Sequence, residues 1–169
     1  MDDLTARRAH LAVALVTRGL RLQDLAALMG VEPYHLTRLR TGVRVRSAAV
    51  SWARSAEVLG LDPGASRPDA PWAPLLPAEE PADPVAARRL RLDLALAARD
   101  ETTAGLARAI DVHQSMVALL RAYGRETGCV TWASAARALD LDPAALAPGG
   151  PWTALFPAEM RAADDSAAA

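Results

Sequence analysis

The sequence repeats itself with a period of 80 residues, and this repeat restricts the possible folds more than any other feature. Trp52 and Trp72 each return 80 positions later, as Trp132 and Trp152. The Pro-Trp segment around Trp72 returns together with Leu, Pro, Ala and Glu at the same spacing. Farther upstream, matching Arg, Leu and Ala residues are offset by 81 positions. The chain is therefore a tandem duplication, in which each copy is one folding unit.

Prolines mark the boundary between the two copies. Seven of the 12 prolines lie from Pro63 to Pro84, and none lies from Val85 to Asp142. Proline ends helices, and a Pro-rich connector is semi-rigid. We therefore expect a first domain over residues 1–80 and a second over 81–160, joined by a Pro-rich linker. The short, Ala-rich stretch 161–169 is expected to be a disordered tail.

Composition predicts an all-α fold. Hydrophobic residues make up 51% of the chain and aromatic residues only 4%, so the core is built mainly from small aliphatic side chains such as Ala and Leu. These residues favour helix over sheet. The 23% of charged residues and the net charge of -1 are typical of a globular protein and not of a disordered one.

The sequence also predicts where the protein resides. Its single cysteine, Cys129, excludes an internal disulfide and fits a reducing cytoplasm. The chain starts Met-Asp-Asp where a secretory signal would carry basic residues, and no uncharged apolar run approaches the ~18 residues of a membrane span. We expect a cytoplasmic protein that makes no contact with membranes.

Apolar periodicity and glycines predict four helices in the first copy. They are expected over 5–17, over 22–29, from Pro33 until Gly42, and over 47–59 with Ser47 as the N-cap. The second and third of these are short and are separated by a tight turn at Gly30. Two short helices joined in this way form a helix-turn-helix arrangement.

The stretch 18–42 closely resembles the Cro/cI-type (XRE-like) helix-turn-helix family of phage and bacterial regulators. Gln23 matches the glutamine that opens the family's second helix, and Gly30 matches the glycine of its turn. The resemblance covers roughly residues 8–61 and, more weakly, 89–141. It implies two tandem lambda-repressor-like helical bundles. In the second copy the residues that replace Gln23, Gly30, Arg38 and Gly42 are Ala104, Asp111, Leu119 and Tyr123.

The resemblance implies a sequence-specific regulator of transcription that binds double-stranded DNA, is associated with the nucleoid, and acts by default as a repressor. Its recognition helix places polar and basic side chains against base edges, while other residues contact phosphate. The candidate DNA-binding residues of the first copy are Gln23, Tyr34, His35, Thr37, Arg38, Arg40, Arg44 and Arg46. Those of the second copy are Gln114, Ser115, Arg121 and Arg125.

Charge is distributed unequally between the copies. Residues 1–60 carry a formal charge of +4, whereas residues 81–141 carry +1. The first copy is therefore the better candidate for binding DNA. A tandem fusion could supply both DNA readers in one chain. Alternatively, the protein is an interaction module whose second copy mediates dimerisation or partner docking, because Leu119 adds an apolar side chain to its outer helix face.

Other chemistry has little support in the sequence. His10, His35 and His113 have no Cys or carboxylate partner at ligand spacing, so no metal site is expected. Cys129 has no histidine nearby, and no phosphate-binding loop or nucleophile elbow occurs. We therefore expect neither an enzyme nor a cofactor.

Overall fold

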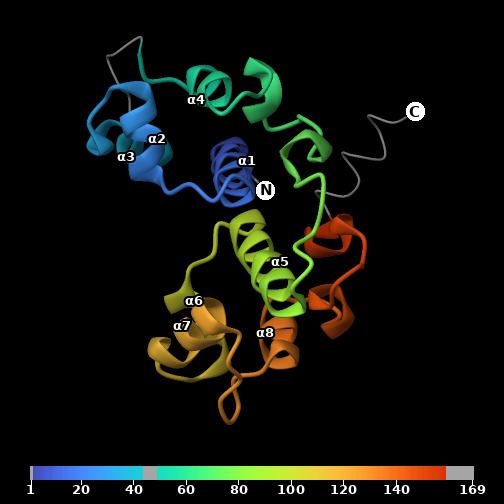
Figure 1. The fold of residues 1–169 in the computed structure, drawn as a ribbon. Helices are drawn as coiled ribbons and strands as arrows, with labels where there is room; N and C mark the ends of the chain where they lie inside the picture. Colours follow the sequence, from blue (N-terminus) through green and yellow to red (C-terminus); the bar gives the residue numbers. More distant parts are fainter. Residues whose placement is uncertain (1, 44–48, 159–169) are drawn as a thin grey trace. The chain divides into compact units, whose positions relative to one another are not determined.

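The computed structural model describes residues 2–43 and 49–158 (Figure 1). Within these residues the chain forms eight α-helices, four 3₁₀-helices and no β-strand, so the all-α prediction is confirmed. The chain divides into two compact units, and the second unit begins at Pro77, four residues before the expected boundary. The predicted tail 161–169 lies outside the described residues.

Unit 1 contains four α-helices followed by two 3₁₀-helices. They are α1 (Asp3–Thr17), α2 (Leu22–Met29), α3 (Pro33–Arg40), α4 (Trp52–Val58), η1 (Pro63–Ser66) and η2 (Ala73–Leu75). Leu25 of α2 and Leu36 of α3 are fully buried, and Leu75 of η2 is 1% exposed. The two short helices are thus held in the unit by a narrow apolar face, and their other faces point outward.

Unit 2 repeats this order of elements. They are α5 (Pro84–Ala98), α6 (Thr103–Ile110), α7 (Gln114–Tyr123), α8 (Trp132–Ala138), η3 (Pro143–Leu146) and η4 (Trp152–Leu155). Leu106, Val117 and Leu155 occupy the positions of Leu25, Leu36 and Leu75 and are likewise fully buried. The two copies therefore keep the same inward-facing positions.

The predicted start of the fourth helix is wrong. Helix α4 begins at Trp52, and its N-cap is Ser51, whose hydroxyl accepts a hydrogen bond from the Arg54 N–H at 3.1 Å. Val50 is buried immediately before the cap, which fixes the entry of the chain into the helix. Ser47, the expected cap, lies outside the described residues. In unit 2 Thr131 caps α8 at the equivalent place.

In unit 1 a buried histidine ties the first helix to the Pro-Trp segment. The His10 ring stacks on Trp72, with ring centroids 3.8 Å apart and planes 21° from parallel. Its Nδ1 lies 2.8 Å from the Ala6 carbonyl oxygen, and its Nε2 lies 3.0 Å from that of Ala70. Each ring nitrogen thus lies within hydrogen-bond distance of a backbone carbonyl, one in α1 and one in the Pro-Trp segment.

In unit 2 Arg91 takes the place of His10. Its side chain is 99% buried, and its guanidinium carbon lies 4.6 Å from the centroid of the Trp152 ring. It donates to the carbonyls of Ala145 and Gly150, the second of which corresponds to Ala70 in the repeat. The same two elements are thus tied together in both units by a polar side chain stacked on tryptophan.

Arg91 also pairs with Glu80, which lies in the segment before α5. Glu80 accepts from Arg91 Nε at 2.5 Å and from the Gly149 N–H at 2.6 Å. Burial alone would raise the pKa of Glu80, but the hydrogen bonds from Arg91 and Gly149 outweigh it and lower the pKa below its ordinary value of 4.5. The segment that precedes α5 is therefore part of the packing of unit 2.

We expect Glu80→Ala to destabilise unit 2 by about 3 kcal/mol, because it leaves a buried guanidinium without its carboxylate. Because folding lowers the pKa of Glu80, its contribution is fully present above pH 4.5 and is lost as the pH falls through the lowered value. Urea unfolding at neutral and acidic pH measures both effects. The exposed neighbour Glu79 provides the control Glu79→Ala, and equal unfolding free energies for the two variants would contradict the assignment.

Candidate functional site

The two short helices of unit 1 are joined at a residue in the left-handed conformation. Gly30 has φ +67° and ends α2, and the Val31 N–H donates back to the Ala26 carbonyl at 3.0 Å. Glu32 then leads into Pro33, the first residue of α3, where proline lacks only an N–H that the helix does not use. This closed turn sets the angle between the two helices.

Unit 2 builds the same turn without glycine. Asp111 has φ +60° and ψ +53°, and the Val112 N–H donates to the Ala107 carbonyl at 3.0 Å. Aspartate tolerates this conformation better than most residues. The turn geometry is therefore retained in the diverged copy.

Helix α3 brings three candidate residues to one face. Tyr34 is 62% exposed and Thr37 is exposed, whereas Leu36 between them is fully buried. The guanidinium carbon of the half-buried Arg38 lies 5.6 Å from the centroid of the Tyr34 ring. The aromatic ring and the cation therefore form one polar patch with Thr37.

Two further candidates, His35 and Arg40, also belong to α3. The half-buried His35 ring lies 5.8 Å from the Tyr34 ring, measured between centroids. Arg40 is half-buried, and burial together with the neighbouring Arg8 lowers its pKa. Arg44 and Arg46 lie outside the described residues.

The start of α2 carries a polar cluster that includes Gln23. The Asp24 carboxylate accepts from the Arg21 backbone N–H at 2.7 Å and lies 3.3 Å from Arg21 Nε. These hydrogen bonds lower the pKa of Asp24. In the amide orientation that satisfies its hydrogen bonds, the oxygen of the exposed Gln23 accepts from Arg21 Nη2 at 2.6 Å. The positive charge of Arg21 thus offsets the negative charge of Asp24 at the start of α2.

The candidates of unit 2 are arranged differently. Gln114 and Ser115 are exposed at the start of α7, and Arg125 is exposed beyond its end. Arg121 instead pairs with Asp93 of α5 at 2.7 Å and donates to the Thr103 hydroxyl. Burial raises the pKa of Asp93, although Arg121 opposes this shift. The Arg121 guanidinium therefore interacts with other residues of unit 2.

Sequence reasoning missed the partner of Arg121. The position of Asp93 in the first copy is Ala12, which has no charge. Comparison of the two copies at the 81-residue offset reveals this difference. Only the structure shows that the Asp93 carboxylate contacts Arg121. The equivalent arginine of unit 1 is Arg40.

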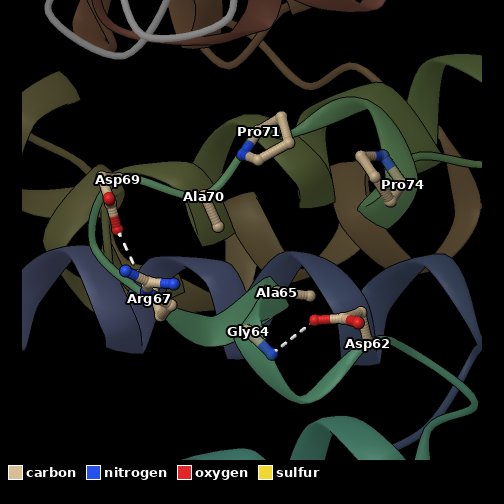
Figure 2. Close-up of a pocket in the computed structure, with 8 residues that line it drawn as sticks. All are labelled: Asp62, Gly64, Ala65, Arg67, Asp69, Ala70, Pro71 and Pro74. Carbon is tan, nitrogen blue, oxygen red and sulfur yellow. Dashed lines mark hydrogen bonds and ion pairs between the residues drawn. The ribbon is translucent and has the colours of Figure 1, made fainter. Parts of the chain in front are cut away.

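A surface pocket of about 390 Å³ lies among the residues that follow α4 in unit 1 (Figure 2). Its walls include Ala65, Pro71 and Pro74. The polar side chains that line it interact within the pocket, as Arg67 pairs with Asp69 at 3.6 Å and Asp62 accepts from the Gly64 N–H at 2.7 Å. Because these polar side chains interact with neighbouring residues of the pocket, they give no indication of a bound ligand.

The part of the chain that the structure describes also lacks two other kinds of feature. No group of three or more His, Cys, Asp or Glu side chains there is placed to hold a metal ion. None of the helices in that part is both long and apolar enough to span a bilayer. Comparison with protein-family models, curated proteins and solved structures finds no match to this chain.

We expect Gly30→Ala to destabilise unit 1 by roughly 1–2 kcal/mol, the cost of placing an L-residue in the left-handed region. A Cβ at Gly30 meets no atom within 4 Å, so the cost arises from the backbone alone. Asp111→Gly is the reverse change in unit 2 and should not destabilise it through the turn. Urea unfolding measures both, and a neutral Gly30→Ala would show that the turn tolerates a different conformation.

Proposed function

We propose that the protein is a sequence-specific double-stranded DNA-binding regulator of transcription, in which unit 1 is the reader. The observation that carries this proposal is the shared face of Tyr34, Thr37 and Arg38 on α3, where Tyr34 and Thr37 are exposed and the half-buried Arg38 lies over the Tyr34 ring. They lie on the second of two short helices joined through Gly30. The resemblance to the Cro/cI-type helix-turn-helix family and the +4 charge of residues 1–60 support the same conclusion.

In this proposal α3 enters the major groove. The Arg38 guanidinium has the fork geometry that matches O6 and N7 of guanine, and stacking over the Tyr34 ring would hold it in place. Thr37 can donate to or accept from a base edge, and His35 lies beside them. Gln23 at the start of α2 would contact phosphate, together with Arg40, Arg44 and Arg46.

The regulatory role follows from this binding mode. A protein that occupies the major groove of an operator excludes other proteins from it, so repression is the default expectation. The two units would then be lambda-repressor-like bundles, and the chain would act in the cytoplasm at the nucleoid. No step of this proposal needs a cofactor or a metal.

We expect Arg38→Ala to weaken specific binding by about 1–3 kcal/mol and to relax the preference at one base pair. The matched control is Arg54→Ala, which removes an exposed arginine of α4 that pairs with Glu57 at 3.1 Å. Fluorescence anisotropy with selected and random duplexes over a salt series measures both affinity and phosphate contacts. Unchanged specificity in Arg38→Ala would remove Arg38 from the reading face.

A second candidate function, docking of a protein partner or a second copy through unit 2, rests on the exposure of Tyr123. This side chain is 72% exposed at the end of α7, and Ala118 and Ala122 of the same helix are exposed as well. Leu119 is half-buried beside them. Apolar side chains on a surface gain free energy when a partner covers them.

If unit 2 docks a partner copy, Leu119→Arg should abolish self-association and leave the DNA affinity of unit 1 unchanged. The control Ala144→Arg adds the same charge at an exposed position of η3. Sedimentation velocity and DNA-binding titrations on both variants provide the two measurements. A dimer that survives Leu119→Arg would contradict the docking role.

A further inference from the structure

The pocket of unit 1 lies at a place that unit 2 covers with a segment of chain. Three of the residues that line the pocket are Ala65, Asp69 and Ala70. At the repeat distance of 80 positions, unit 2 has Ala145, Gly149 and Gly150. The two units can therefore be compared residue by residue around this surface.

In unit 2 the covering residue is Glu80, which belongs to the segment before α5. Its carboxylate accepts from the Gly149 N–H at 2.6 Å and from Arg91 Nε at 2.5 Å. Arg91 in turn donates to the carbonyls of Ala145 and Gly150. The half-buried Glu80 thus holds the segment 77–83 over the residues that correspond to the pocket wall.

In unit 1 the same place is the pocket of about 390 Å³. Figure 2 shows Pro71 and Pro74 on one side of it and Ala65 on the other. The position of Arg91 is occupied by His10, whose two ring nitrogens lie near backbone carbonyls. The side chain that fits between these walls is therefore apolar, and not acidic as in unit 2.

The repeat also supplies a segment with such a side chain. Segment 77–83 returns 80 positions later as 157–163, and both begin with Pro-Ala-Glu. At the position of Glu80 the later segment has Met160. Methionine is apolar and flexible, so it fills irregular gaps well. An ionic pair, Arg91 with Glu80, thus corresponds to an uncharged combination of His10 with methionine.

We infer that the pocket of unit 1 binds the segment 157–163 of a second copy of the chain, so that chains associate head to tail. Segment 77–83 follows unit 1 in the sequence and packs on the next unit. Segment 157–163 follows unit 2, so the same relation continued beyond the chain places it on unit 1 of the next copy. Such a contact joins two different surfaces and is heterologous.

The inference is independent of DNA binding, because the pocket lies in the residues after α4 and not on α3. Each chain has one pocket and one segment of this kind. Since the two surfaces differ, each bound chain leaves one pocket and one segment open at the ends of the assembly. Association is therefore expected to increase steadily with concentration instead of stopping at a closed dimer.

The test uses two full-length variants, each of which blocks one side of the contact. Met160→Glu places a charge on the segment, and Pro74→Glu places one on the exposed wall of the pocket. The matched controls are Ala167→Glu, farther along the C-terminal stretch, and Ala53→Glu, at an exposed position of α4. Sedimentation velocity over a concentration series is measured for each variant and for mixtures.

We expect both blocked variants to associate at least about tenfold more weakly than their controls, because burial of a methionine side chain contributes that much or more. An equal mixture of the two blocked variants should form a dimer. In that mixture the intact pocket of Met160→Glu meets the intact segment of Pro74→Glu, so one contact remains possible.

A second variant recreates the pair seen in unit 2. His10→Arg combined with Met160→Glu places an arginine and a glutamate where unit 2 has Arg91 and Glu80. We expect the double variant to recover most of the association that Met160→Glu loses. Circular dichroism checks that it is folded, and a folded double variant without recovery would contradict the placement of residue 160 in the pocket.

Three results would overturn the inference. The first is an unmodified protein that stays monomeric at every concentration, which includes the case of a segment bound within its own chain. The second is association that survives in both blocked variants but is lost in Leu119→Arg, which would assign it to α7. The third is a mixture of blocked variants that forms no dimer. DNA binding by α3 is tested separately by Arg38→Ala.

Discussion

Each unit depends on one polar side chain of its first helix, which ties that helix to the Pro-Trp segment at the end of the unit. His10 stacks on Trp72 and Arg91 on Trp152, and each contacts the carbonyl at the same repeat position, Ala70 or Gly150. Units of this size have small cores, and helices of seven to ten residues are not stable alone. The tryptophan that closes each bundle, buried in unit 1 and half-buried in unit 2, therefore supplies apolar burial that the short helices lack.

The interior and the outer surface of the two units have diverged to different degrees. Apolar inward positions stay apolar, as Leu25 and Leu106 show, and the turn keeps its left-handed conformation although unit 2 has Asp111 in place of Gly30. The outer face changed in charge and polarity, because Arg38 became Leu119 and Leu20 became Glu101. Packing constrains the first set of positions, whereas it leaves residues on the outer face free to change.

The sequence predicted the features that depend on local patterns. Apolar spacing located α2 and its end at Gly30, and the 80-residue period indicated two similar units. It placed the start of α4 at Ser47 instead of Trp52, because several serines can serve as caps and tertiary burial of Val50 decides among them. The Arg91–Glu80 and Arg121–Asp93 pairs join separate segments, so no local pattern could reveal them.

These long-range pairs also explain why equal numbers of arginines in the two units would not produce equally positive surfaces. Unit 2 uses Arg91 and Arg121 within its own packing, each against a carboxylate, so little of their charge is offered to a ligand. Unit 1 has His10 at the position of Arg91 and Ala12 at the position of Asp93. Net charge separates the two copies more clearly than these pairs do, because residues 1–60 carry a formal charge of +4 and residues 81–141 carry +1.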